Sequence, residues 1–348
     1  MKKLLVLLIL LTMTSVRATA AEMEFKAPPV PDIGAEFLEE QPDSLTEGFL
    51  SICEEALPYI YPALTEGVSV CVKVIGIMLI LSVLENFVGL QMNTICLAGT
   101  LAVATALLTV SRALIPLGKE TVQELSSYGK LLLPVMTGAL AAQGKPTASG
   151  ALYAGTALFN SLLTGMINRL LLPSVYIFLA ISVASAALRD SFIGKLKGII
   201  KSTVIWLLKI LLYVFTGYMT ISGVVSGTTD AMAMKAAKVT ISGVVPVVGG
   251  ILADASEAVL VGAAVMKNAA GIYGILAVIA IAVGPFIRLG VQYLLIKITG
   301  AICSAFGSKP LCGLIDDVCA AMGLVLAMTA AVGLMLLIST VCFMRVTV

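Results

Sequence analysis

Six stretches of this chain are apolar over the length that a helix needs to cross a lipid bilayer. An α-helix rises 1.5 Å per residue, so a span takes about 20 mostly apolar residues. The candidate spans are residues 68–90, 94–115, 170–188, 203–224, 271–290 and 321–343. Only 12% of the 348 residues are charged, against about 25% in a soluble domain. We therefore predict an all-α fold, a polytopic membrane helix bundle.

The first residues have the layout of an export signal. Two lysines at residues 2–3 precede an apolar core at residues 4–11, and the small residues Ala18 and Ala20 follow. We predict a cleavable signal peptide at residues 1–21, with an uncleaved anchor as the alternative. Cleavage would leave the mature N-terminus outside the cytoplasm.

The segment that follows, residues 22–66, is strongly acidic. It holds eleven acidic residues and a single basic one, Lys26. Prolines at positions 28, 29, 31 and 42 favour an extended, solvated conformation. We expect an acidic exported segment here, able to dock a basic partner, and a polytopic transmembrane domain over residues 67–348.

Basic residues set the expected orientation. Arg189, Lys195, Lys197 and Lys201 crowd the short link between the third and fourth spans. The positive-inside rule places such a link in the cytoplasm. Counting spans from an exported N-terminus gives the same answer, so the two arguments agree.

A proline- and glycine-containing stretch occurs twice, 112 residues apart. "LPVMTGALAAQGKPTASGAL" covers residues 133–152 and "VPVVGGILADASEAVLVGAA" covers residues 245–264. The prolines and glycines that pair in this alignment are Pro134 with Pro246, Gly138 with Gly250, and Gly150 with Gly262. We predict an internal repeat over about 90–190 and 200–300. Chance matching between helices rich in Ala, Gly and Val is the alternative.

Each copy reads as two apolar arms that meet at a polar break, which predicts a broken or re-entrant helical hairpin in each half. The breaks fall at Lys145 and Pro146 in the first copy, and at Asp254, Ser256 and Glu257 in the second. Free backbone groups are tolerated at membrane depth only inside protein or beside a water-filled cavity. These five residues are therefore our candidates for a polar pathway, unless both breaks emerge at the membrane surface. Asn160 and Asn268 follow the breaks and could join helices through hydrogen bonds.

Enzymatic function is disfavoured by the residue inventory. The chain has no histidine, which removes Ser-His and Cys-His catalysis and histidine-ligated metals. The adjacent Asp316 and Asp317 point about 100° apart on a helix and cannot form a facing carboxylate pair. Phosphate-loop and dinucleotide motifs are absent as well. We expect no enzyme, no cofactor, no metal site and no nucleic-acid partner.

Three segments give the chain a family resemblance. "VIGIMLILSVLENFVG", "GKLLLPVMTGALAAQGKPTASGALY" and "DASEAVLVGAAVMKNAAGIYGILAV" lie behind a signal and an acidic leader. In content and order they resemble the stage III sporulation protein AE family of endospore-forming bacteria. The resemblance implies a multi-pass protein of the mother-cell membrane around the forespore. It also implies a channel or secretion-like complex with other stage III sporulation membrane proteins and a forespore-side partner, needed for forespore development after engulfment.

Two other functions stay open at this point. The expected hairpins would equally suit a stand-alone secondary transporter of a small solute or ion. A scaffold without any conduit is the third reading. The family resemblance carries no catalytic residues to this chain.

Overall fold

The structure of the chain is a computed structural model that describes residues 28–38, 44–87, 92–188, 191–244 and 249–345. For residues 32–33, 85–87, 92–96, 191 and 223–267 it describes the backbone alone. The expected signal peptide at residues 1–21 lies outside the described residues.

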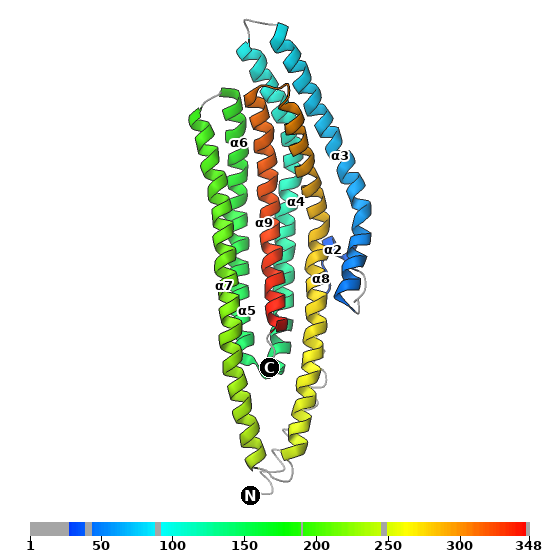
Figure 1. The fold of residues 1–348 in the computed structure, drawn as a ribbon, viewed down its shortest axis with the longest axis vertical. Coiled ribbons are helices and arrows are strands. Elements are labelled where there is room, and N and C mark those ends of the chain that lie inside the picture. Colours follow the sequence, from blue (N-terminus) through cyan, green and yellow to red (C-terminus); the bar gives the residue numbers. More distant parts are fainter. Residues whose placement is uncertain (1–27, 39–43, 88–91, 189–190, 245–248, 346–348) are drawn as a thin grey trace.

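Long antiparallel helices make up the described molecule (Figure 1). A short helix, α2 (Asp32–Ala35), precedes α3 (Leu45–Phe87) and α4 (Met92–Ala142). A continuous helical rod follows, made of α5 (Pro146–Met166), the π-helical segment η1 (Ile167–Leu171) and α6 (Leu172–Leu188). The chain ends with α7 (Ser191–Val244), α8 (Gly249–Cys303) and α9 (Lys309–Arg345).

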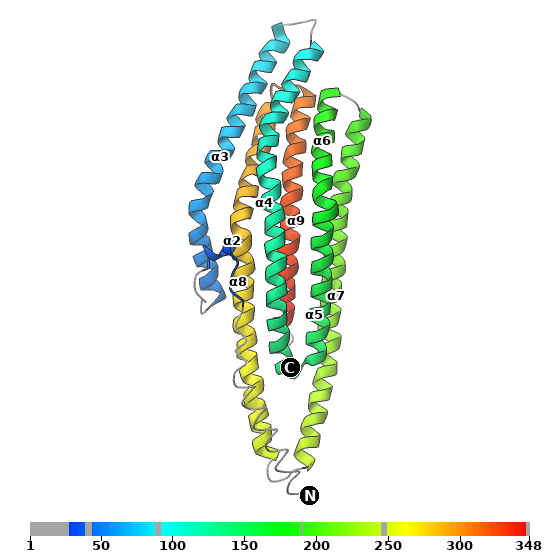
Figure 2. The ribbon, with the colours of Figure 1, turned by 180° about the vertical axis from the view of Figure 1, so that it is seen from behind.

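The all-α membrane bundle predicted from the sequence is confirmed. In the described residues, six helices are long and apolar enough to cross a membrane, and each contains most or all of one of the six predicted spans. Their order along the chain is up and down, with successive helices antiparallel (Figures 1 and 2). Even α9, with 37 residues, is about 55 Å long and so exceeds a hydrocarbon core of about 30 Å.

Helix α9 lies at the centre of the bundle and contacts α4, α5, α6, α7 and α8. Small residues let its neighbours approach closely. A Cβ atom at Gly129 of α4 would lie 2.6 Å from Leu336 of α9. Buried side chains follow α9 along nearly its whole length, and this central helix therefore fixes the positions of the helices around it.

Part of the acidic leader is docked rather than solvated. A Cβ atom at Gly34 would come within 2.8 Å of the Ile281 backbone, so α2 lies directly on α8. Phe37 is buried, and its ring contacts the ring of Tyr59 in α3 in a tilted arrangement, with 5.0 Å between the ring centroids. Helix α3 itself begins at Leu45 and continues past residue 66 without interruption. Burial of apolar side chains thus docks the leader on the bundle, while Pro31 keeps an extended backbone (φ −60°, ψ 161°).

The first predicted break is present, but its arms are full-length helices. Helix α4 ends at Ala142, Gly144 takes φ = 79°, and Pro146 starts α5. Only glycine adopts such a positive φ at little cost, and proline suits the first position of a helix. The arm before this break is a full-length helix, since α4 runs as one 51-residue helix through the polar stretch 118–130. That stretch contains good helix formers and no proline.

The second predicted break is not at its expected place. Asp254, Ser256 and Glu257 lie within the continuous helix α8, since no proline or positive φ interrupts that segment. Helix α7 ends at Val244 and α8 begins at Gly249. The gapless alignment therefore pairs the turn after α4 with the interior of α8. The internal repeat is not confirmed, although 90–190 and 200–300 each contain one long helical hairpin.

Candidate functional site: a polar face and pocket on helix α4

The residues predicted from the sequence are spread over the bundle. Lys145 is buried in the turn between α4 and α5, whereas Pro146 is exposed at the start of α5. Pro134 and Gly138 lie inside α4, and Gly150 lies on the exposed side of α5. The remaining residues fall on α8: Gly250, Asp254, Ser256, Glu257, Gly262 and an exposed Asn268. Pro246 lies outside the described residues. The structure does not bring these residues together into one site.

Asn160 is the exception that does join helices. Its side chain is buried, and its Nδ2 donates a hydrogen bond of 3.3 Å to the carbonyl of Ser126 in α4. One turn earlier, the Thr156 hydroxyl donates at 3.1 Å to Ser339 of α9. This polar layer links α5 to α4 and α9, which agrees with the predicted role of Asn160 as an interhelical contact.

A polar face on helix α4 is the feature that the sequence reasoning missed. The exposed residues between positions 102 and 130 are all small or polar. They are Ala102, Thr105, Thr109, Arg112, Ala113, Pro116, Lys119, Glu120, Gln123, Ser127 and Lys130. Their spacing of three and four residues puts them on one side of the helix. From Thr105 to Lys130 this polar face is about 38 Å long, comparable with a hydrocarbon core.

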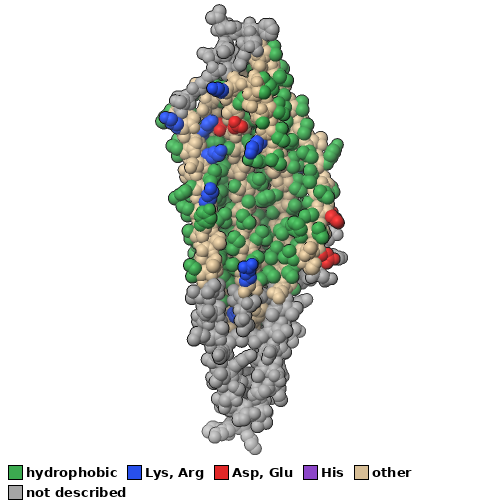
Figure 3. Space-filling view, viewed as in Figure 1, with side chains coloured by type: hydrophobic (Ala, Val, Ile, Leu, Met, Phe, Trp, Pro, Cys, Tyr) green, Lys and Arg blue, Asp and Glu red, His purple; other side chains and the backbone are tan. Residues whose placement is uncertain are grey.

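Apolar surfaces flank the polar face on both sides. No large hydrophobic side chain of α4 is exposed between Leu101 and Leu131. On the neighbouring α3, Tyr61 and Val72 are 76% and 63% exposed, and Leu158 of α5 is 59% exposed. Figure 2 shows α4 in front, between α3 and the rod of α5 and α6. The opposite side of the molecule is hydrophobic over its middle (Figure 3).

Contact with lipid would be costly along this face. A charged side chain at the bilayer centre costs about 2.5–3.5 kcal/mol on insertion scales. Lys119 and Glu120 lie in the middle of the face, so if the face crossed the hydrocarbon core, neither side chain could easily reach an interface by snorkelling. The two charges together would cost about 5–7 kcal/mol, a large part of a typical net stability of about 5–15 kcal/mol. We infer that the polar face contacts water or protein.

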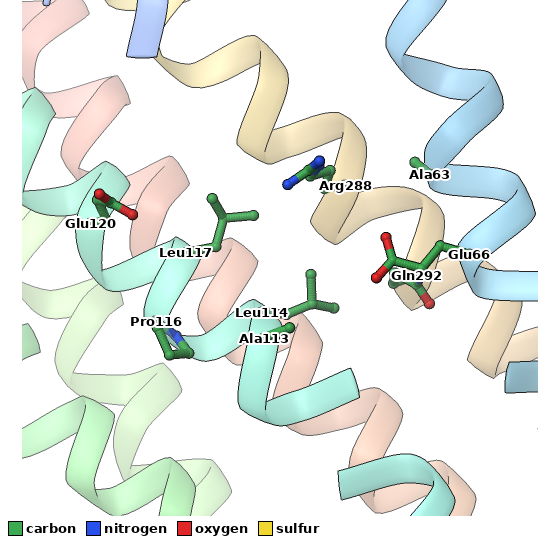
Figure 4. Close-up of a pocket in the computed structure, with 9 residues that line it drawn as sticks. All are labelled: Ala63, Glu66, Ala113, Leu114, Pro116, Leu117, Glu120, Arg288 and Gln292. Atoms are coloured by element: carbon green, nitrogen blue, oxygen red, sulfur yellow. The ribbon is translucent and has the colours of Figure 1, made fainter. Parts of the chain in front are cut away.

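A cavity of about 230 Å³ opens where the polar face meets α3 and α8. Figure 4 shows Glu66 of α3 and Gln292 of α8 on one side, Glu120 of α4 on the other, and Arg288 of α8 between them in this view. The three charged residues are exposed, whereas Gln292 is buried and its Oε1 has no hydrogen-bond partner. The rest of the lining comes from Ala63, Ala113, Leu114, Pro116 and Leu117. This pocket offers charges of both signs around a fixed amide.

The pocket presents charged side chains and a buried amide, groups that can bind polar molecules. Within the described residues, no three His, Cys, Asp or Glu side chains come together as a metal site. The cysteines that the structure describes are all free thiols. Nothing in the pocket pairs a nucleophile with a base.

A periodicity test would have found this face from the sequence. The stretch "GKETVQELSSYGK" reads as a link when spans are sought by hydropathy alone. The polar residues of this stretch and the preceding Thr105, Thr109 and Arg112 recur every three or four residues, the spacing of one helix face. Glu66, Arg288 and Gln292 lie far apart in the sequence, so no local pattern could have gathered the pocket.

Comparison with known proteins gives a consistent result. A family model described as stage III sporulation protein AE matches residues 36–347. Stage III sporulation protein AE of Bacillus subtilis (strain 168) is 25% identical over 221 residues, which cover 63% of this chain. The alignment spans 55% of the length of that relative. No solved structure matches the chain.

Proposed function

The chain belongs to the stage III sporulation protein AE family, and we propose that it is the membrane-embedded part of a channel complex between mother cell and forespore. As a member of this family it is a multi-pass membrane protein of a sporulating bacterium. The proposal adds a location, the mother-cell membrane around the forespore, and a role in forespore development after engulfment. Other stage III sporulation proteins and a forespore-side protein would be its partners.

The distribution of basic residues supports one orientation. The exposed basic residues Lys195, Lys201 and Lys309 lie at the end of the bundle where α7 and α9 begin, which suits the cytoplasm. An exported leader would lie on the other side of the membrane, and α2 packs at Ile281, in the middle part of α8 (Figure 1). Helices α7 and α8 extend beyond α9 at the opposite end of the bundle (Figure 1). In this orientation their tip enters the space between the two membranes, where a forespore-side partner could reach it.

The polar face of α4 carries the proposal. In a single bundle the side chains of this face are exposed, so we propose that further subunits complete a water-filled lumen around it. The lumen would be lined by Thr109, Lys119, Glu120, Gln123 and Ser127. The apolar side chains on α3 and α5 would then contact neighbouring subunits or lipid.

Apolar substitution on the face tests this function. Gln123→Leu with Ser127→Leu would coat the middle of the face with hydrocarbon. We expect the protein to accumulate normally while heat-resistant spores decrease at least ten-fold, with forespores arrested after engulfment. The matched control is Thr216→Leu with Thr220→Leu on α7, where exposed threonines lie among large apolar side chains. Equal spore counts in both double variants would argue against a wet, functional α4 face.

A stand-alone secondary transporter is the second candidate, and the pocket on α4 favours it. Secondary transporters bind their cargo near the middle of the membrane, and this pocket offers charged groups of both signs for such a cargo. Purified protein in liposomes separates the two functions. Solute uptake without any partner protein would favour the transporter, and uptake that requires the other stage III proteins would favour the channel component.

A further inference from the structure

We propose that the pocket between α3, α4 and α8 binds a small zwitterion, a molecule that carries a primary ammonium group and a carboxylate or phosphate group. Glu66 and Glu120 would hold the ammonium group, Arg288 the anionic group, and Gln292 would accept one further N–H hydrogen bond. The site deepens the proposed function, because its mouth lies on the polar face of α4 and has to be wet.

Gln292 is the observation that first points to a ligand. Its side chain is 3% exposed, and its Oε1 is buried without a hydrogen-bond partner. A buried acceptor left unpaired costs about 1–3 kcal/mol, so such groups normally have a partner. The amide lines the pocket and thus presents an unused acceptor to whatever enters it.

Helix α3 holds this amide in place. A Cβ atom at Gly67 would lie 3.0 Å from both the Oε1 and the Nε2 of Gln292. The amide therefore lies close against the α3 backbone, in space that a side chain at position 67 would occupy. Fixed orientation of a polar group lowers the entropy that binding would otherwise cost.

The charges around the pocket are separated in a way that leaves room for a ligand. Among the described residues, no ion pair within the 4.0 Å limit joins Arg288 to Glu66 or Glu120. The three charged groups nevertheless line one cavity. A ligand with charges of both signs can pair with all three groups at once. A simple cation would be repelled by Arg288, and a simple anion would be repelled by the two carboxylates.

The size of the cavity limits the ligand. Its volume of about 230 Å³ is below the range of about 300–1,000 Å³ for drug-sized ligands. A free amino acid and an ethanolamine phosphate group both have the required ammonium and anion within a few bonds. They share one chemistry but come from different sources, a dissolved solute and a phospholipid headgroup.

The test is ligand-observed NMR on the purified full-length protein in detergent, with four small probes. Glycine and phosphoethanolamine carry both charges, methylamine carries only the ammonium group, and acetate carries only the carboxylate. We expect saturable binding of at least one zwitterion, and at least ten-fold weaker binding of methylamine and acetate. Absence of saturable binding by both zwitterions in detergent and in lipid nanodiscs would overturn the proposal, as would equal binding of all four probes.

Variants assign the binding to this pocket. Glu66→Gln and Arg288→Gln alter exposed side chains, so folding should be unaffected, and each should weaken zwitterion binding about ten-fold or more. Gln292→Met keeps the side-chain size and removes the amide, and it should weaken binding in the same direction. The matched control is Glu55→Gln, an exposed residue of α3 outside the pocket. Unchanged binding in Glu66→Gln and Arg288→Gln would place the ligand elsewhere and refute the site.

Nanodiscs distinguish the two sources. If the ligand is a headgroup, phosphatidylethanolamine nanodiscs should compete with the phosphoethanolamine probe and phosphatidylcholine nanodiscs should not, since a quaternary ammonium cannot donate hydrogen bonds. If the ligand is a solute, glycine should bind equally in both. The proposed binding site and the proposed channel role can be refuted independently of each other. Spore formation that depends on Gln123 and Ser127 without any zwitterion binding would refute only the site.

Discussion

Gly155 gives the sharpest quantitative test of how the bundle is packed. This residue of α5 lies under the ring of Tyr218 from α7, and a Cβ atom added there would overlap the ring. In Gly155→Ala the ring has to move. Its hydroxyl would lose the 3.0 Å hydrogen bond to the Ala151 carbonyl, worth about 0.5–1.5 kcal/mol. Its contact with Phe159 at 5.9 Å is worth about 0.5–1.5 kcal/mol.

Overpacking adds about 1–3 kcal/mol, and the better helix propensity of alanine returns about 0.5–1 kcal/mol. The expected net loss for Gly155→Ala is about 1–5.5 kcal/mol. Gly150→Ala is the control, because Gly150 lies on the same helix and has no atom within 4 Å of an added Cβ. We expect that control to be neutral or slightly stabilised. Thermal aggregation in detergent, followed by size-exclusion chromatography, measures both. A Gly155→Ala protein as stable as the wild type would refute the α5–α7 packing.

Three further predictions concern a salt bridge, a turn and a helix tip. Lys197→Ala and Asp317→Ala each remove a partner of a 2.5 Å salt bridge between α7 and α9. Each single variant should lower the free energy of unfolding by about 1–2 kcal/mol. The double variant should lose less than the sum of the two single losses. If the losses measured by thermal unfolding are strictly additive, the two side chains do not interact. Gly144→Ala places a side chain at φ = 79° and should cost about 1–2 kcal/mol, so an unchanged unfolding temperature would contradict that turn. Asp254→Lys or Glu257→Lys near the start of α8 should block sporulation after engulfment while the protein accumulates, and normal spore yields would exclude a role for the tip.

Hydropathy was sufficient to predict which segments form the spans. Apolar stretches near 20 residues long have few alternatives in a chain with so few charges, and each predicted span lies in its own helix. The turn at Gly144 and Pro146 could also be anticipated, since both residues act on the backbone locally.

The helix lengths and the second break could not be predicted in this way. Polar residues such as Lys119 and Glu120 end a hydropathy window, but they do not end a helix, because their helix propensity is good. In the same way, Asp254 and Glu257 are compatible with a helix outside the lipid. The pocket depends on α3, α4 and α8 meeting in space, and that contact is set by close packing at residues such as Gly67.

The central claim is that the α4 face is wet at membrane depth, and thiol labelling tests it most directly. In a background without the seven natural cysteines, single cysteines at Thr109, Gln123 and Ser127 are compared with single cysteines at Leu158 and Ile177. Leu158 is about level with Ser127, because its neighbour Asn160 bonds to Ser126. We predict that a charged, membrane-impermeant thiol reagent modifies the cysteines at the three α4 positions. The cysteines that replace Leu158 and Ile177 should stay unmodified. Protection of all five positions would contradict the conduit.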